Sequence, residues 1–267
     1  GAPAGTSSPI IDHPDVRRML MTQRAWIDAM RVLVYANAAA LDRADAARAA
    51  GETDAARGWQ ERADLLIPLS KGVCTDVANE MTSLALQVHG GMGYVEESGA
   101  AQHYRDARIA AIYEGTNGIQ AADLVGRKLP MRGGAVVTEL LDELAARADD
   151  LGTTAALSDA ADALRAAIEA CRTATAHLLQ VAPADPRSLL AGSTPYMRLL
   201  GTTVCAGLLA KAALAAPDTE FGAEFGTAKV TSARFFCEQI LPGAVGLLPA
   251  VQGGADLLDA LTPDQLA

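Results

Sequence analysis

The stretch ALQVHGGMGYVEESGAAQHYRDARIAAIYEGTNGIQ, residues 85–120, holds two glycine-marked breaks that frame one short helix. The first break is a glycine-rich loop over residues 89–99, and the second lies at residues 114–116. Apolar spacing predicts a helix over about residues 101–112 and a new helix over about residues 118–127. Each break leaves backbone groups at a helix end without an intrahelical partner, so both are candidate binding sites.

The rest of the chain also has the three- and four-residue apolar spacing of helices, and it lacks strand-like alternation of useful length. A kink or an interrupted helix start is expected at Pro68, and Asp12 is the expected N-cap of the first helix. The other predicted helices cover residues 14–49, 61–88, 137–148, 157–178, 188–215 and 223–241, the last ended by Pro242 and Gly243. The sequence therefore predicts an all-α fold of two consecutive helical bundles.

Composition narrows the classes of function. The 267 residues are 50% hydrophobic and 4% aromatic, and the formal net charge is −10. An acidic chain without a Lys/Arg block argues against nucleic-acid binding. The most apolar stretch, residues 199–209, is too short to span a membrane. No signal peptide is recognisable, and the four cysteines form no C-x-x-C pair, so buried free thiols and a cytoplasmic location are expected.

The glycine-rich loop has a possible role in binding anions. Gly90 and Gly91 leave their backbone N–H groups unshielded by side chains, and such a loop can form a concave anion site. Gln87, at the end of the preceding helix, adds an amide that donates and accepts hydrogen bonds. The competing interpretation is a plain turn between helices, since glycine commonly ends a helix.

Glu114 follows the apolar residues 109–112 and directly precedes a helix N-terminus. A carboxylate in apolar surroundings costs free energy unless it is paired, solvated or used. Apolar surroundings raise the pKa of a carboxylate, whereas a nearby helix N-terminus lowers it. The balance of the two effects can tune Glu114 as a general base. The alternative is a solvated glutamate at a helix junction. Asn117, with Gln120 three residues later, is the predicted N-cap of the next helix.

Other kinds of site find little support in the sequence. The histidines His13, His89, His103 and His177 show no spacing that converges on one metal ion, so no metal site is expected. No G-x-S-x-G or Walker A motif occurs, and the GGMG run follows no predicted strand, which excludes a Rossmann fingerprint.

Residues 85–120 together resemble the C-terminal signature of the acyl-CoA dehydrogenases. The resemblance joins Q-x-x-G-G-x-G-Y, R-D-A-R-I and Y-E-G-T-N-x-I-Q in that order and spacing. It implies a linker over residues 1–11, the family's C-terminal helical domain over residues 12–130, and an appended helical domain over residues 135–267. The family's N-terminal helical domain and middle β-domain are absent from this chain.

The resemblance also implies a set of roles for individual residues. Glu114 matches the base that removes the α-proton of an acyl-CoA thioester while a hydride passes to N5 of FAD. Glu114 also contributes a backbone N–H near the thioester carbonyl, beside Gly115. Thr116 matches a residue at the flavin. Gln87, Gly90 and Gly91 match the loop that holds the ADP part of the flavin of a partner subunit.

Further expectations come from the same resemblance. It implies a homodimer or homotetramer that passes electrons to an electron-transfer flavoprotein. Arg105 and Asp106 are expected to organise the turn before Glu114 through charge-assisted hydrogen bonds. Two alternatives stay open: an acyl-CoA oxidase, which delivers electrons to oxygen, and a non-catalytic helical assembly module. Gly118 stands where the family often has Glu or Gln, and the upstream residues that hold the flavin pyrophosphate are not in this chain.

Overall fold

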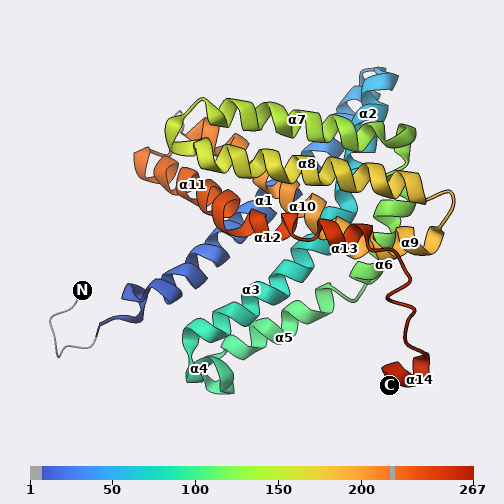
Figure 1. The fold of residues 1–267 in the computed structure, drawn as a ribbon. Coiled ribbons are helices and arrows are strands. Elements are labelled where there is room, and N and C mark those ends of the chain that lie inside the picture. The colour runs from blue at the N-terminus through green and yellow to red at the C-terminus, as the bar shows by residue number, and fades with distance from the viewer. Residues whose placement is uncertain (1–7, 217–219) are drawn as a thin grey trace.

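The computed structural model describes residues 8–216 and 220–267, and those residues contain helices and no strand (Figure 1). The predicted all-α fold is confirmed. Most of the linker predicted over residues 1–11 lies outside the described residues. Its end forms a 3₁₀ turn, η1 (Ile10–Asp12), directly before the first long helix.

The helical elements fall into two groups along the chain. The first group comprises α1 (Pro14–Ala49), α2 (Thr53–Pro68), η2 (Leu69–Val73), α3 (Cys74–His89), α4 (Gly91–Tyr94), η3 (Glu96–Ser98), α5 (Ala100–Ala110), α6 (Asn117–Asp123) and η4 (Leu124–Lys128). The second comprises η5 (Met131–Gly134), α7 (Ala135–Gly152), η6 (Ala155–Leu157), α8 (Ser158–Val181), α9 (Pro186–Ala191), α10 (Ser193–Ala215), α11 (Ala223–Phe235), η8 (Phe236–Ile240), α12 (Leu241–Val245), α13 (Leu248–Gln252) and α14 (Pro263–Leu266).

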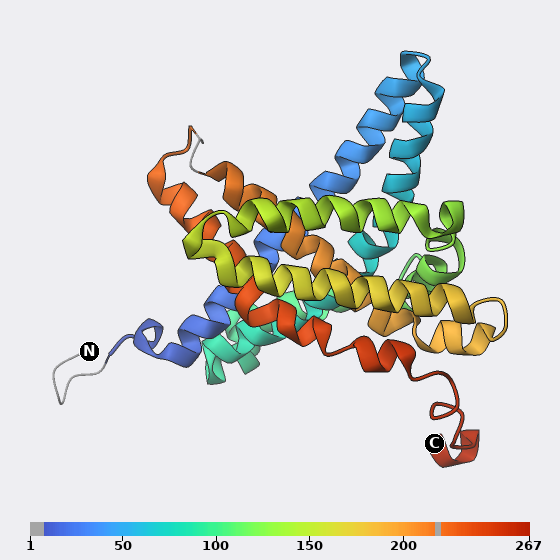
Figure 2. The ribbon, with the colours of Figure 1, turned by 45° about the horizontal axis from the view of Figure 1, so that its top comes forward.

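The first group is built from two pairs of antiparallel helices. Helices α1 and α2 form a hairpin whose tip projects from the body (Figure 2). Helices α3 and α5 lie side by side and are joined at their far end by α4 and η3 (Figure 1). This second pair carries the glycine-rich loop at one end and the Glu114 turn at the other.

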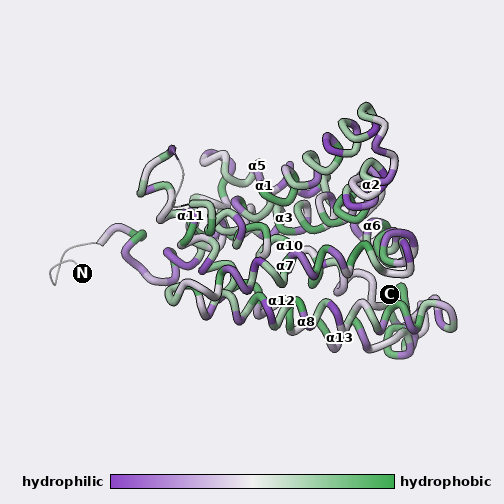
Figure 3. The backbone as a smooth tube through the Cα atoms, turned by 90° about the horizontal axis from the view of Figure 1, so that it is seen from above, coloured by the Kyte–Doolittle hydropathy of each residue, from purple (hydrophilic) through white to green (hydrophobic). Residues whose placement is uncertain are grey.

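The second group surrounds α10. Helices α7 and α8 lie side by side against it, and viewed from above α10 runs between α1 and α8 (Figure 3). One continuous core joins residues of both groups, including Leu33 of α1, Leu144 of α7, Leu164 of α8 and Leu200 of α10. Division of the chain at residues 130–135 remains a prediction, because the two groups share this core.

Helix α10 differs from the expectation drawn from hydropathy. With 23 residues and a window of mean hydropathy 1.3, it is long and apolar enough by length and composition to cross a membrane. The expectation rested on residues 199–209 alone, which are too few to span a membrane. In the structure 72% of the window is buried against other helices, as in the core helix of a folded domain.

The predicted break near Pro68 takes the form of a π-helical segment. The predicted helix of residues 61–88 begins earlier, at Thr53, and Pro68 ends α2 before five π-helical residues, η2, lead into α3. Proline has no N–H to donate to the preceding turn, and π-bulges often relieve such interruptions. The backbone therefore widens where the chain passes beneath α10.

Two other predictions about helix ends were wrong. His13 occupies the N-cap position of α1 in place of Asp12 and makes no side-chain capping bond. Pro242 and Gly243 lie inside α12 rather than at the end of the helical run, because proline is tolerated in a first turn.

Close contacts and ion pairs attach α10 and α11 to the first group. A Cβ added at Gly72 would meet the Met197 side chain, and one added at Gly201 would meet the Val73 side chain, so each glycine packs directly against a side chain of the other segment. Asp28 of α1, whose side chain is 2% exposed, accepts a 2.7 Å hydrogen bond from Lys229 of α11. These contacts join the two groups at η2 and at α1.

Candidate functional site

The turn between α5 and α6 has an unusual backbone. Glu114 has a φ of 52°, and Gly115 follows with a φ of 86°. Glycine adopts such angles without steric cost, but a residue with a Cβ pays about 1–2 kcal/mol in the left-handed region. Strained residues of this kind persist where surrounding contacts hold them, often at functional sites. The structure therefore holds Glu114 in a conformation that its own backbone disfavours.

Thr116, and not Asn117, is the N-cap of α6. The Thr116 hydroxyl accepts a 3.4 Å hydrogen bond from the Ile119 N–H, whereas Asn117 is the first residue of the helix. The predicted Asn117–Gln120 capping box is therefore wrong. Gln120 instead donates from Nε2 to the carbonyl of Glu114 at 3.4 Å, which places a second contact on the turn.

The side chain of Asn117 is buried and fully engaged beneath the turn. Its Nδ2 donates to the carbonyl of Gly72 at 3.1 Å and to Asp76 Oδ1 at 2.6 Å. Its Oδ1 accepts from Lys71 Nζ at 2.7 Å. Lys71 Nζ also donates to the carbonyl of Gly115 at 2.7 Å. The turn thus rests on η2 and the start of α3 through a buried polar network.

Glu114 is exposed in this chain. Four apolar residues close to it in the sequence, Ile109, Ile112, Tyr113 and Ile119, are between 45% and 60% exposed. The described residues therefore do not bury the acid, and apolar surroundings for its carboxylate remain a prediction. Within residues 8–216 and 220–267, the Glu114 N–H has no hydrogen-bond acceptor. Glu114 thus combines an exposed residue position with a backbone N–H that no described group accepts.

The fold favours glycine at three positions of the glycine-rich loop, one of which is Gly99 with a φ of 73°. Gly90, at the end of α3, has φ 60° and ψ −142°, a conformation that favours glycine. Gly93 is buried, and a Cβ there would collide with the Leu86 carbonyl. Gly91 has open space around its Cα and no positive φ, so the described part of the chain does not itself require glycine there. Gln87 is exposed beside it.

The structure places the predicted site residues in two separate groups. Glu114, Gly115 and Thr116 share the turn before α6, while Gln87, Gly90 and Gly91 lie at the far end of the α3–α5 pair. The eleven residues of α5 separate the two groups, which corresponds to roughly 16 Å of helix. The Glu114 turn and the glycine-rich loop therefore do not form a single pocket in this chain.

The role expected of Arg105 and Asp106 was wrong. Arg105 makes a bidentate ion pair with Glu96, at 2.7 and 2.9 Å, which braces the glycine-rich end rather than the Glu114 turn. Asp106 accepts a 3.5 Å contact from Gln102 on its own helix. Within the described residues neither side chain makes a hydrogen bond to the Glu114 turn.

Lys71 is the residue that sequence reasoning missed at the turn. It lies 43 positions before Glu114, and nothing in the local pattern connects a lysine after Pro68 with that turn. The only available signal is a lysine in an otherwise apolar segment, LIPLSKGV, where a buried charge calls for a partner.

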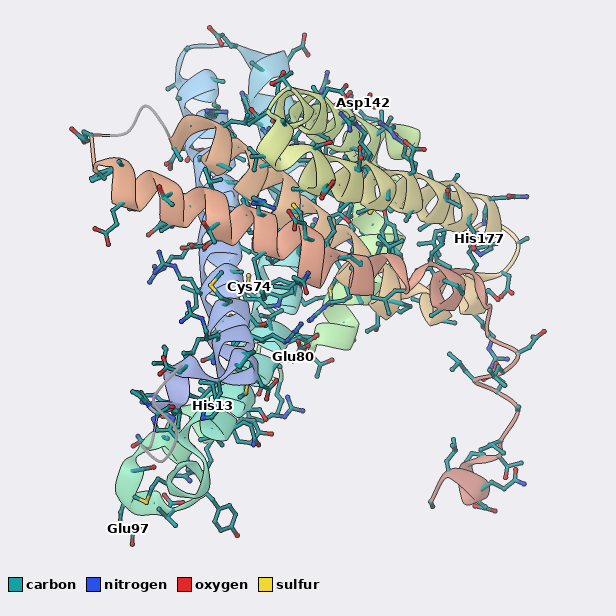
Figure 4. The ribbon with its side chains drawn as sticks, turned by 60° about the vertical axis from the view of Figure 1, so that its left-hand side comes forward. His13, Cys74, Glu80, Glu97, Asp142 and His177 are labelled. Carbon is teal, nitrogen blue, oxygen red and sulfur yellow. The ribbon has the colours of Figure 1, made fainter. Side chains whose placement is uncertain are left out.

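No group of three or more potential metal ligands occurs in the described part of the chain, and His13 and His177 lie far apart (Figure 4). A cavity of about 880 Å³ lies between α3, α10 and residues 247–258. Asp76, Glu80 and Arg198 line it, but Glu114 does not. The Glu114 turn is therefore an open surface site and not part of this cavity.

Comparison with known proteins supplies the family. Residues 3–129 match the family model described as "Acyl-CoA dehydrogenase, C-terminal domain". Residues 137–262 match the model described as "Acetyl-CoA dehydrogenase C-terminal like". The chain belongs to the acyl-CoA dehydrogenase family. The resemblance carried by residues 85–120 is thus confirmed for the chain as a whole.

Individual members of the acyl-CoA dehydrogenase family are similar over most of the chain. A 3-methylmercaptopropionyl-CoA dehydrogenase of Ruegeria pomeroyi is 43% identical over 87% of this chain and 40% of its own length. The fold resembles that of an acyl-CoA dehydrogenase complexed with FAD from Bacillus anthracis, with TM-score 0.68, 19% identity, and coverage of 99% of this chain and 45% of the other. Acyl-CoA oxidase 3 of Yarrowia lipolytica gives TM-score 0.70 at 16% identity, with coverage of 99% and 40%.

The chain thus spans about 40% of the length of the curated relative from Ruegeria pomeroyi.

Proposed function

We propose that this chain supplies the C-terminal helical part of an FAD-dependent acyl-CoA dehydrogenase in which Glu114 removes the α-proton of an acyl-CoA thioester. The observation that carries the proposal is the Glu114 turn, which presents a carboxylate and an unpaired N–H side by side in a stretch with exposed apolar side chains. The apolar side chains can contact an acyl chain, and the carboxylate and the N–H can act on the α-proton and the carbonyl oxygen of a thioester.

Each residue of the turn has a definite task in this reaction. The Glu114 carboxylate accepts the α-proton, and its N–H donates to the thioester oxygen, where negative charge develops as the proton leaves. A donor aimed at such an oxygen typically contributes about 3–4 kcal/mol to lowering the barrier. Bound FAD supplies the acceptor for the hydride that leaves the β-carbon. Thr116 lies next to this flavin in the proposal.

The exposure of Glu114 in this chain is also explained by the proposal. A general base of this kind works in a dry site, where removal of water strengthens its interactions. The four exposed apolar neighbours are the surface on which the rest of the protein, with flavin and substrate, excludes water from the carboxylate.

The glycine-rich loop receives the second part of the cofactor. We place Gln87, Gly90 and Gly91 at the ADP part of an FAD molecule bound to a partner subunit, because Gly91 has open space that a close approach would use. This arrangement calls for a homodimer or homotetramer built through the helices. An electron-transfer flavoprotein is the proposed electron acceptor, and the cytoplasm is the proposed location.

The full-length protein that contains this chain tests the proposal. We expect the purified protein to carry a flavin whose visible absorbance is bleached by acyl-CoA without oxygen. The E114Q variant should bind acyl-CoA and leave the flavin oxidised. A colourless, folded full-length protein would instead support a non-catalytic assembly module.

An acyl-CoA oxidase is the second candidate, because the fold resembles that of an acyl-CoA oxidase to a similar degree. The two enzymes share the proton abstraction at Glu114 and differ in how the reduced flavin is reoxidised. Rapid oxygen consumption during turnover would indicate the oxidase, and reduction of an electron-transfer flavoprotein would indicate the dehydrogenase.

A further inference from the structure

The backbone conformation of the Glu114 turn needs contacts from other segments to stabilise it. Two consecutive residues, Glu114 and Gly115, have positive φ angles, and the first of them is not glycine. Neither belongs to a helix, since α5 ends at Ala110 and α6 begins at Asn117. The conformation of the turn is therefore decided by groups that contact it from outside.

The strongest external contact comes from Lys71. Its Nζ donates to the Gly115 carbonyl and to Asn117 Oδ1, both at 2.7 Å. In residues 8–216 and 220–267 the ammonium forms no direct ion pair, and Asp76 joins its network only through the Asn117 side chain. The direct hydrogen bonds of Lys71 are thus made to the turn and to Asn117. Hydrogen bonds from a charged donor are roughly twice as strong as neutral ones.

Lys71 itself is fixed by the segment that carries it. It lies in the middle of η2, where Gly72 packs under Met197 of α10. The Asn117 amide ties the carbonyl of Gly72 to the same network at 3.1 Å. The backbone that carries Lys71 is therefore held by contacts with α10 and with the Asn117 side chain.

We propose that Lys71 is a positioning residue for Glu114. By holding the Gly115 carbonyl, its ammonium sets the direction of the neighbouring Glu114 carboxylate and N–H. Lys71 itself contacts neither substrate nor flavin in this proposal. The inference rests on the proposed function, because positioning matters only if Glu114 is the base.

The test compares K71M with wild type in the full-length holoenzyme. We measure the single-turnover rate of flavin reduction at saturating acyl-CoA, the dissociation constant of a non-oxidisable acyl-CoA analogue, and the flavin content. We expect the reduction rate per bound flavin to fall about 10- to 100-fold, as expected for misplacement of a catalytic group by about 1 Å. The dissociation constant should change less than threefold.

Two further variants complete the experiment. K71Q keeps a neutral donor at this position, so its reduction rate should lie between those of K71M and wild type, and it serves if K71M does not fold. K211M is the matched control, because Lys211 is an exposed lysine of α10 remote from the turn. It should reduce its flavin at the wild-type rate.

Two results would overturn the proposal. One is a wild-type reduction rate in K71M and K71Q. The other is a loss of stability or flavin content with an unchanged rate for each flavin that remains bound, which would make Lys71 merely structural. If E114Q also reduces its flavin normally, the proposed function fails, whereas a normal K71M beside an inactive E114Q rejects the role of Lys71 alone.

Discussion

Removal of Lys229 tests how α11 is attached to α1. Lys229 Nζ donates to Asp28 Oδ1 at 2.7 Å, and Arg24 Nε contacts the other carboxylate oxygen at 3.2 Å. The Asp28 side chain is 2% exposed, whereas that of Arg24 is 52% exposed. K229M therefore leaves a buried carboxylate with one partner that is itself mostly in water.

The expected loss of stability follows from these contacts. Removing one partner of a buried ion pair costs about 3–5 kcal/mol. The remaining half-exposed pair with Arg24 offsets about 1 kcal/mol of this, so K229M should lose about 2–4 kcal/mol. For a chain of this size that lowers Tm by about 4–16 °C. D28N should cost less, because Lys229 is 21% exposed and can turn toward water.

The pH dependence gives this prediction a second readout. Burial alone would raise the pKa of Asp28, but the hydrogen bond and charge of Lys229, with those of Arg24, outweigh it and lower the pKa. A lowered folded-state pKa stabilises the protein above the unfolded pKa of about 3.9, and this contribution disappears as pH falls through the folded pKa. The gap between wild type and K229M should therefore narrow below about pH 4.

Urea unfolding of the chain, followed by circular dichroism near neutral pH and in acid, measures both effects. The double variant D28L/K229M should recover most of the stability lost in K229M, since an apolar pair can replace a buried ion pair at little cost. A loss in K229M below about 0.5 kcal/mol, the range of ordinary surface changes, would refute the reasoning.

Two other predictions concern the glycine loop and the thiols. G93A should lose about 1–3 kcal/mol of stability, because its Cβ would collide with the Leu86 carbonyl. G91A should keep its stability but weaken FAD binding by the full-length protein, because Gly91 has open space around it. Thermal melting and flavin titration distinguish the two effects, and an equal loss of stability in both variants would contradict the assignment. Burial raises the pKa of Cys171 and Cys237 to about 12 and that of half-buried Cys74 to about 11, and it raises that of Cys205 well above its usual value. A thiol reagent near pH 8 should therefore label the chain only after unfolding, and fast labelling of folded protein would show that a thiol is accessible.

The regular parts of the fold were predictable from the sequence because they depend on local apolar spacing. The first helix was predicted over residues 14–49, and α1 spans Pro14–Ala49. The helix ends were less predictable. Asn117 looks like an N-cap by composition, but its amide is drawn into a buried network with Gly72 and Asp76, and Thr116 takes the cap. Tertiary partners decided this case.

The candidate site was predictable where the sequence motif names its residues, and not where distant segments meet. Glu114 and Gly91 are part of contiguous motifs. Lys71 reaches the turn only because η2 packs under α10, and that depends on the close approach at Gly72 and Gly201. Arg105 was assigned to the wrong end of α5 because a motif gives the spacing of residues along the chain and not their partners.

Exchange of the substrate's α-proton tests the central claim most directly, because it does not depend on electron transfer. The full-length holoenzyme is incubated in deuterated water with an acyl-CoA analogue that cannot lose a β-hydride, and α-deuterium is followed by NMR. We predict rapid exchange with wild type and none above background with E114Q, although E114Q still binds the analogue. Exchange at the wild-type rate in E114Q would show that another group is the base.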